Sequence, residues 1–300
     1  MVMAGKIKKS INIWSFPGEM SIAQCIDLAK KAGFEGIELA LSADGELSLS
    51  STDDELAEIK RKADEAGVEI ASIATGLFWQ FSLTSNREDI REKAKQVVRR
   101  EIDIAAKLGV DSILVCPGTV GVDFKPDEVV PDAGNIEFFA GSEVIDYDVA
   151  YARSQEALKE LAPYAEEKGV VICIENIWNK FLLSPLEFRS FIDEIGSPYV
   201  QVYLDVGNMV LFGYPEQWIK ILGSRIKRIH FKDFRRGTAQ LMGFVELLTG
   251  DVSWDKVVEA LHNIGYESWV SAEMCPPYKL YPDQNIYNAS AAMDRILGMK

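Results

Sequence analysis

The chain has 300 residues, of which 32 are Lys or Arg and 46 are Asp or Glu, so its formal charge is −14. Hydrophobic residues make up 48% of the chain, which is enough for a large buried core and excludes disorder as its main state. The negative balance argues against binding to nucleic acid or to an anionic membrane surface, because both need clustered Lys and Arg.

The cysteines, Cys25, Cys116, Cys173 and Cys275, lie far apart in the sequence. No CxxC pair occurs, so we expect neither a zinc ribbon nor a thioredoxin-type site, and we predict reduced thiols. The N-terminal segment has no apolar run before the first strand, and no stretch of about 18 apolar residues occurs. These features predict a cytoplasmic protein with no signal peptide and no membrane span.

One pattern recurs along the chain: an amphipathic helix, a glycine, and a short run rich in Val, Ile and aromatic residues. The expected helices cover 22–32, 54–66, 92–108, 157–168 and 254–264, with a last one near 289–297. Thr52, Ser184 and Ser253 are expected at helix starts. Glycine tolerates the left-handed conformation of a helix C-terminus, and the expected capping glycines are Gly33, Gly67, Gly109, Gly169, Gly196, Gly223 and Gly265.

A first strand is expected over 8–14, and seven more follow the glycines. Such near-continuous apolar strands are typical of a parallel sheet that is buried on both faces. Eight strands that alternate with helices predict an α/β fold, a single (β/α)₈ TIM barrel domain over residues 1–300. An open doubly wound sheet is the alternative, but no GxGxxG or GxxxxGK[ST] loop follows the first strand.

Two connections are too long to be plain turns, one at about 117–147 and the other at about 231–251. Loops of this length in a compact domain usually carry function. Each follows an expected strand, so in a barrel both would lie on the catalytic face. We therefore predict that they are active-site loops.

A metal-type ligand closes each of the last four expected strands. VVICIE ends in Glu175, VQVYLD in Asp205, IKRIH in His230 and WVSAE in Glu273. In a barrel these positions meet at the C-terminal mouth, where they would form an oxygen-rich site for a divalent ion. We favour Mn²⁺, with Mg²⁺, Co²⁺ or Zn²⁺ as alternatives. His262, the other histidine of the chain, is expected on a solvated helix surface.

The ordered ligands and the segments IENIWNKFLLSP, VYLDVGNMVLFGYPEQWI, RIKRIHFKD and AEM resemble the xylose isomerase-like barrel superfamily, in its sugar phosphate isomerase/epimerase branch. The resemblance covers nearly the whole chain and extends to L-ribulose-phosphate, hexulose-phosphate and ketose epimerase enzymes. It implies one divalent metal ion per chain, held by Glu175, Asp205, His230 and Glu273. It further implies that Glu175 and Glu273 are the catalytic acid and base, and that the chain forms a dimer or tetramer.

The implied activity is a metal-dependent isomerase or epimerase that acts on a sugar or a sugar phosphate. The reaction is proton abstraction next to a carbonyl, through an enediolate that the metal stabilises. A positioned carboxylate contributes about 10²–10⁴-fold as general base. Return of the proton to the opposite face would epimerise the centre, and return to the neighbouring carbon would isomerise the sugar.

Eight residues that follow or close strands near the mouth are predicted to bind substrate: Asn208, Arg236, Lys180, Lys232, Trp14, Trp178, Asn179 and Glu38. Arg236 stands where the epimerases carry a substrate-binding arginine, with Arg235 as the alternative. Either lysine could hold a phosphate or a carboxylate, or be surface charge. Asn176 and Trp79 are further candidates for the pocket wall. We expect no chemical role for Cys116.

Two positions depart from the ketose 3-epimerase pattern. Asn208 stands where those enzymes usually carry a histidine, and Leu182 stands where they carry a glutamate. The departures keep open a metal-dependent lyase or deglycosidase that acts on 3-keto-glycosides, including C-glycosides, with a partner subunit. An apurinic-endonuclease-like nuclease is a remote alternative, because its three-zinc site needs more histidines than this chain has. The intact ligand set argues against a barrel that only binds or scaffolds.

Overall fold

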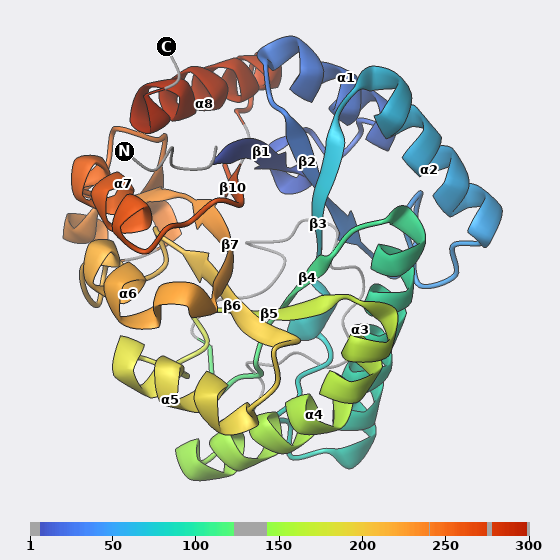
Figure 1. Cartoon of the computed structure of the whole chain (residues 1–300), viewed down its shortest axis with the longest axis vertical. Coiled ribbons are helices and arrows are strands. Elements are labelled where there is room, and N and C mark those ends of the chain that lie inside the picture. The colour runs from blue at the N-terminus through green and yellow to red at the C-terminus, as the bar shows by residue number, and fades with distance from the viewer. Residues whose placement is uncertain (1–6, 123–142, 240, 275–277, 299–300) are drawn as a thin grey trace.

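Eight parallel strands close into a barrel within the residues that the computed structural model describes, which are 7–122, 143–239, 241–274 and 278–298 (Figure 1). The hydrogen-bonded order around the barrel is β1-β10-β7-β6-β5-β4-β3-β2. The strands are β1 (Lys8–Asn12), β2 (Gly36–Leu41), β3 (Glu69–Thr75), β4 (Ser112–Val115), β5 (Val171–Glu175), β6 (Val200–Asp205), β7 (Ile226–Phe231) and β10 (Trp269–Ala272). The predicted (β/α)₈ barrel is confirmed, and the open sheet is excluded.

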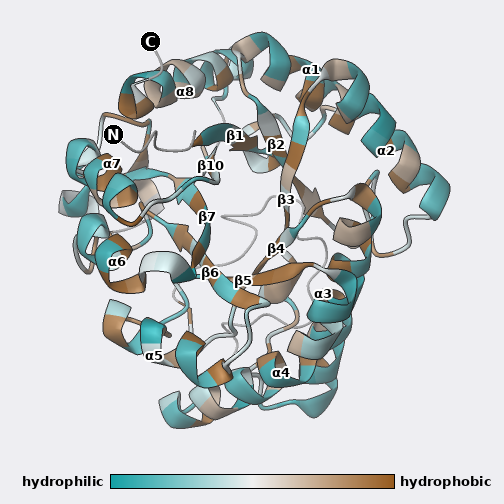
Figure 2. Ribbon diagram, in the orientation of Figure 1, coloured by the Kyte–Doolittle hydropathy of each residue, from teal (hydrophilic) through white to brown (hydrophobic). Residues whose placement is uncertain are grey.

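The helices form a ring around this barrel and turn their hydrophilic faces outward (Figures 1 and 2). They are α1 (Ile22–Ala32), α2 (Asp53–Ala66), α3 (Glu88–Leu108), α4 (Tyr147–Lys168), α5 (Pro185–Ile195), α6 (Pro215–Leu222), α7 (Trp254–Asn263) and α8 (Pro282–Leu297). In the described part of the chain, none of them is long and apolar enough to cross a membrane.

Capping bonds are present at two of the three predicted helix starts, and Ser253 precedes α7 without one. Thr52 forms a capping box with Glu55 at the start of α2, and Ser184 accepts a backbone N–H at the start of α5. The predicted helices over 92–108 and 157–168 begin earlier, as α3 and α4. Arg87, which precedes α3, is not a capping residue type, so the sequence carries no start signal there. Asp146, which precedes α4, is a capping residue type but forms no side-chain capping bond. The last helix likewise begins earlier than predicted, at Pro282.

The predicted glycine caps hold at five helices and differ at two, since α7 ends on Ile264 with Gly265 one residue beyond it, and Gly223 has another conformation. Gly33 ends α1 with φ 91° and ψ 23°, which is the left-handed conformation that was expected. Gly223 also has a positive φ of 57°, but its ψ is −131°. The chain there enters a short 3₁₀ helix (Gly223–Arg225) before β7 instead of passing directly into the strand.

The predicted long connections follow β4 and β7, at the C-terminal end of the barrel. Residues 123–142 of the first connection lie outside the described residues. The second is not a plain loop, because β8 (Asp233–Phe234) and β9 (Phe244–Val245) pair as an antiparallel hairpin. Asp233 holds the base of this hairpin, since its carboxylate accepts bonds from the backbone N–H groups of Gly250 and Val252 and from the indole N–H of Trp254.

Side chains alternate along each strand between the barrel lumen and the helix layer. The main apolar core lies between the strands and the helices. A smaller apolar cluster belongs to the lumen and consists of Ala74, Leu114, Val171, Cys173 and Tyr203. Toward the C-terminal ends of the strands the inward-facing residues become polar. The lumen is therefore packed with apolar side chains at depth and lined by polar side chains at its mouth.

Glu101 is an unusual member of the helix layer. It is fully buried on α3, and neither carboxyl oxygen has a hydrogen-bond partner among the described residues. Burial raises its pKa well above the usual range, and the negative charge of Glu38 raises it further. The folded protein therefore holds a proton on Glu101 that the unfolded chain releases above about pH 4.5.

We predict that this proton makes the protein less stable as pH rises. The folded state binds more protons than the unfolded state from about pH 4.5 up to the raised pKa, so the free energy of unfolding falls across that window, by at most about 1.4 kcal/mol per pH unit. Urea unfolding of the metal-free protein at several pH values between 5 and 8 measures the slope. Glu101→Gln should reduce the dependence of the free energy of unfolding on pH. Glu259→Gln, on an exposed part of α7, is the control and should leave that dependence unchanged. Equal slopes in the wild type and both variants would contradict the prediction.

Candidate metal centre

The four predicted ligands come together at the C-terminal mouth of the barrel. Glu175 and Asp205 are the last residues of β5 and β6, His230 lies near the end of β7, and Glu273 directly follows β10. Asp205 pairs in register with His230 on the neighbouring strand. Ligand atoms from all four residues lie within 4.8 Å of one another, and all four side chains are buried.

His230 stands at the middle of this cluster. Its Nδ1 lies 3.2 Å from Glu273 Oε2, 3.4 Å from Glu175 Oε1 and 3.8 Å from Asp205 Oδ2. Three carboxylates therefore surround one ring nitrogen. A neutral imidazole nitrogen with carboxylate oxygens around it is a donor set that divalent ions such as Mn²⁺ and Zn²⁺ accept.

Two oxygen atoms show that these residues fit a cation. Asp205 Oδ2 and Glu273 Oε2 are buried and have no well-formed hydrogen bond from the described residues. The positive group nearest to both is the Lys232 ammonium, whose Nζ lies 3.3 Å from Asp205 Oδ2 and 2.7 Å from Glu273 Oε2. Buried carboxylates are costly unless cations compensate them, and one ammonium faces three carboxylates here, so the centre suits a bound metal ion as a second cation.

Two asparagines hold the carboxylates in place. The Asn176 side chain bridges β5 and β6, because it donates to the carbonyl of Asp205 and accepts from its N–H, both at 2.8 Å. The backbone N–H of Asn208 donates to Asp205 Oδ1 at 2.7 Å. The Asn208 amide also donates to the Asn176 carbonyl at 3.0 Å and reaches Glu175 Oε1 at 3.5 Å. These bonds orient the ligands before any ion arrives.

The two glutamates of the centre differ in acidity. Burial raises the pKa of Glu175 to about 7, although His230 opposes the shift. Burial acts in the same direction on Glu273, but the charges of Lys232 and His230 outweigh it and hold its pKa well below the usual range. Two carboxyl groups whose environments push their pKa values apart are typical of an acid and base pair.

A pocket opens on the centre and is walled mostly by aromatic and apolar side chains. Its lining consists of Trp14, Thr75, Phe78, Trp79, Leu114, Cys116, Glu175, Ile177, Trp178, Asn208, Lys232, Phe244 and Glu273. Both glutamates reach this wall, whereas Asp205 and His230 are fully buried behind it. Burial raises the pKa of the Cys116 thiol to about 12, so a reactive thiolate is not available there.

Four residues predicted to bind substrate lie off this wall. Arg236 donates to the carbonyls of Val210 and Gly213, at 2.8 and 3.2 Å, and so braces the loop after β6. Lys180 is exposed. The amide of Asn179 is buried and donates to the Gly118 carbonyl.

Glu38 is the fourth, and its position differs most from the prediction. It is fully buried below the pocket and bonds His230, so it is placed against a ligand rather than against substrate. The sequence placed Glu38 at the end of its strand, but β2 continues to Leu41, so Glu38 lies within the strand, three residues before its end. Its contact with His230 across the lumen could not be predicted from the sequence.

Other residues of the wall were missed from the sequence. Phe244 reaches it from the hairpin, whose two-residue strands are too short to give a periodic pattern. Phe78 lies beside Trp79 in the short 3₁₀ helix Leu77–Trp79 that follows β3. The aromatic run at the end of that strand was a signal that could have identified it. His262 lies exposed on α7, as predicted.

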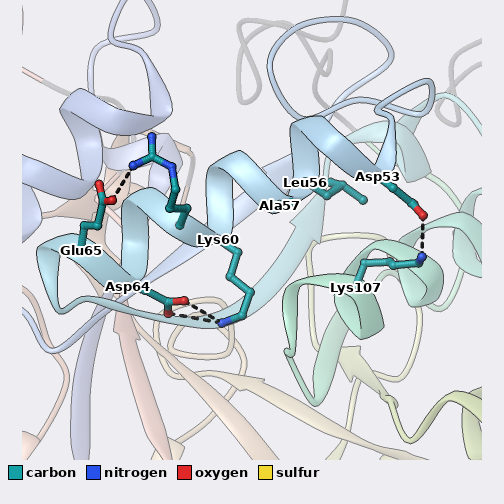
Figure 3. A pocket seen from close by; sticks show the side chains of 8 residues that line it. Asp53, Leu56, Ala57, Lys60, Asp64, Glu65 and Lys107 are labelled. Carbon is teal, nitrogen blue, oxygen red and sulfur yellow. Dashed lines mark hydrogen bonds and ion pairs between the residues drawn. The ribbon is translucent and has the colours of Figure 1, made fainter.

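A second hollow lies on the outside of the barrel, along α2 (Figure 3). Its charged side chains pair with one another: Lys60 with Asp64, Arg61 with Glu65, and Lys107 with Asp53. Exposed pairs of this kind are ordinary surface chemistry. This hollow therefore has no converging unsatisfied groups to bind a ligand.

A family model described as xylose isomerase-like TIM barrel matches residues 26–295. The chain is 28% identical over 213 residues to a 2-epi-5-epi-valiolone 7-phosphate 2-epimerase of an Actinoplanes species, covering 70% of this chain and 67% of that protein. It is 26% identical over 271 residues to a putative L-ribulose-5-phosphate 3-epimerase of Escherichia coli strain K12, covering 85% of this chain and 84% of that protein.

Solved structures of the same fold include a D-psicose 3-epimerase with D-tagatose from Clostridium cellulolyticum H10. It has a TM-score of 0.75 and 22% identity, covering 96% of this chain and 98% of that one. An L-ribulose 3-epimerase has a TM-score of 0.77 and 17% identity, covering 98% of this chain and 95% of that one. At these identities the likeness establishes the barrel architecture.

We predict that the metal-free protein binds one Mn²⁺ per chain. Asp205→Asn should weaken this binding more than about 100-fold, because loss of a residue that only hydrogen-bonds a metal ligand already costs about 10–100-fold. Calorimetric titration measures both constants. Mn²⁺ at about 100 times its Kd should also stabilise the wild type by about 2.7 kcal/mol. His262→Asn is the matched control and should bind normally. Equal affinity in the wild type and Asp205→Asn would refute the centre.

Proposed function

The chain belongs to the xylose isomerase-like TIM barrel family, and we propose that it is a divalent-metal-dependent isomerase or epimerase of a sugar or sugar phosphate. One observation carries the proposal. Of the four clustered ligands, Glu175 and Glu273 also line the pocket, while Asp205 and His230 lie behind them. Two carboxylates that face the same bound molecule can remove a proton from one carbon and return one.

Glu175 and Glu273 enter the pocket from different sides of the centre. They come from β5 and from the end of β10, and β6 and β7 stand between these strands in the barrel. In the proposed reaction one glutamate accepts the proton next to the substrate carbonyl and the other donates a proton to the product. Asn208, which contacts Glu175 and lines the pocket, is placed to hydrogen-bond a sugar hydroxyl.

Glu175, Asp205, His230 and Glu273 would hold the divalent ion. When bound, such an ion offsets the negative charge that develops on the substrate oxygens as the proton leaves, which is worth several kcal/mol. The protein contributes a fixed arrangement of acid, base and hydrogen-bond donors. We favour Mn²⁺ on the basis of the oxygen-rich donor set.

The chemistry of the pocket wall supports a sugar as substrate. Trp14, Trp178 and Phe244 offer flat apolar faces against which the C–H face of a sugar can lie. Trp178 is held rigidly, because its indole N–H donates to the Asn208 carbonyl at 2.8 Å and its ring packs edge-on against Phe234. The names of the relatives, an epimerase of a valiolone 7-phosphate and a putative epimerase of L-ribulose 5-phosphate, agree with a carbohydrate or carbohydrate-like substrate. A cytoplasmic location and a homo-oligomeric state, a dimer or a tetramer, stay predictions from the sequence.

We predict that the Mn²⁺-loaded protein, in D₂O, places deuterium on the carbon next to the carbonyl of its substrate. L-ribulose 5-phosphate, L-ribulose, D-psicose and D-tagatose form the test panel, and NMR measures exchange and product. Glu273→Gln should lower kcat by about 10²–10⁴-fold, because it removes a proton-transfer group. Chelation should abolish turnover, and added Mn²⁺ should restore it.

Glu259→Gln is the matched control, since this exposed glutamate on α7 lies away from the mouth, and it should keep full activity. Undiminished turnover by chelated protein, or full activity of Glu273→Gln, would contradict the proposal. Release of an aglycone from a 3-keto-glycoside, without epimerisation of any ketose, would instead identify the site as that of a lyase.

A further inference from the structure

A second buried carboxylate stands directly beneath the metal centre. Glu38 is fully buried, and its carboxylate receives four contacts from side chains of the lumen. Oε1 lies 2.5 Å from the Asn12 amide nitrogen and 2.7 Å from His230 Nε2. Oε2 lies 2.5 Å from both the Ser72 and the Tyr203 hydroxyl oxygens. These partners come from β1, β3, β6 and β7, so one carboxylate joins strands all around the lumen.

The direction of these hydrogen bonds follows from chemistry. An ionised carboxylate only accepts, and it offers about four lone-pair sites. Four donors surround Glu38, and the Asn12 amide nitrogen among them can only donate. An ionised Glu38 therefore requires His230 to present its Nε2 as an N–H toward it. The other ring nitrogen, Nδ1, then points the opposite way, toward Glu175, Asp205 and Glu273.

We propose that Glu38 is a positioning residue that fixes His230 with Nε2 protonated and Nδ1 aimed at the metal centre. The inference rests on the proposed metal-dependent function and adds to it the residue that orients the nitrogen ligand. A histidine that donates its second N–H to a carboxylate has its tautomer and ring orientation set before an ion binds.

Neighbouring contacts restrain the same imidazole. The Tyr203 ring lies 4.4 Å from it, centroid to centroid, and the Tyr203 hydroxyl bonds Glu38. Rotation of the imidazole would break the bond to Glu38 and meet this ring. His230 thus has one orientation in which both of its nitrogens have suitable partners.

The Glu38 cluster also reaches the substrate pocket. Asn12 donates to Glu38, and its side-chain oxygen accepts the backbone N–H of Trp14 at 2.7 Å. Trp14 lines the pocket. Glu38 therefore connects the orientation of the metal ligand to one wall of the substrate site through a single asparagine.

Metal titration tests the inference with Mn²⁺ alone. We expect Glu38→Gln to raise the Kd for Mn²⁺ by about 10–100-fold, because outer-shell partners of metal ligands contribute on that scale. Glu38→Asp keeps the charge and should recover part of the loss. Glu101→Gln is the matched control: it alters another fully buried glutamate of the barrel that does not contact His230, and it should leave the Kd unchanged.

An NMR measurement on the wild type reads the tautomer directly, so the test does not depend on the variant folding. The chain has two histidines, and His262→Asn assigns the remaining ¹⁵N signals to His230. In protein loaded with Zn²⁺, which is diamagnetic, we expect a protonated Nε2 with a slowly exchanging proton and an unprotonated Nδ1. Glu38→Gln should speed the exchange of that proton.

Three outcomes separate the possibilities. A proton on Nδ1 of His230 in the metal-loaded wild type overturns the inference. Equal Mn²⁺ affinity in the wild type and a folded Glu38→Gln protein also overturns it, with the proposed function left standing. A wild type that binds no divalent ion removes the proposed function, and the positioning role with it.

Discussion

The burial of like charges at one end of the barrel is the constraint on which the rest of the site depends. Three carboxylates and an imidazole bring ligand atoms within 4.8 Å of one another, behind a wall of aromatic side chains. Away from water their repulsion is poorly screened, so the folded state needs cations beside them. Lys232 supplies one, and the donor set suits a divalent ion as the other. Asn176, Asn208 and Glu38 then keep the ligands from turning away from each other.

The barrel makes such a cluster possible because of its geometry. Alternate side chains of every strand enter the lumen, and parallel strands bring all their C-terminal ends to one mouth. A carboxylate or histidine at the inward-facing end of one strand therefore lies close to those of other strands, although these residues are far apart in the sequence. The same geometry places Glu38 one layer below, where it faces His230 from the far side of the lumen.

This geometry explains how much could be predicted. Glycine-capped helices and apolar strands repeat, so the barrel and the order of its strands were readable. Glu175, Asp205, His230 and Glu273 close such strands, so the centre was readable too. Glu38 was expected to close a strand as well, but β2 continues to Leu41, so Glu38 lies deeper in the barrel. Its role depends on the stagger between strands, which the sequence does not show. Arg236 and Phe244 lie on the connection after β7, whose hairpin is held by Asp233 and has no periodic pattern. Their positions therefore required the structure.

The central claim is that these four side chains share one ion. Anomalous diffraction from crystals of the protein soaked in Mn²⁺, recorded on both sides of the manganese absorption edge, tests it most directly. The account predicts a single strong peak per chain, in contact with His230 Nδ1 and with oxygens of Glu175, Asp205 and Glu273. A well-ordered barrel with no peak at that position, or with manganese bound only elsewhere, would contradict it.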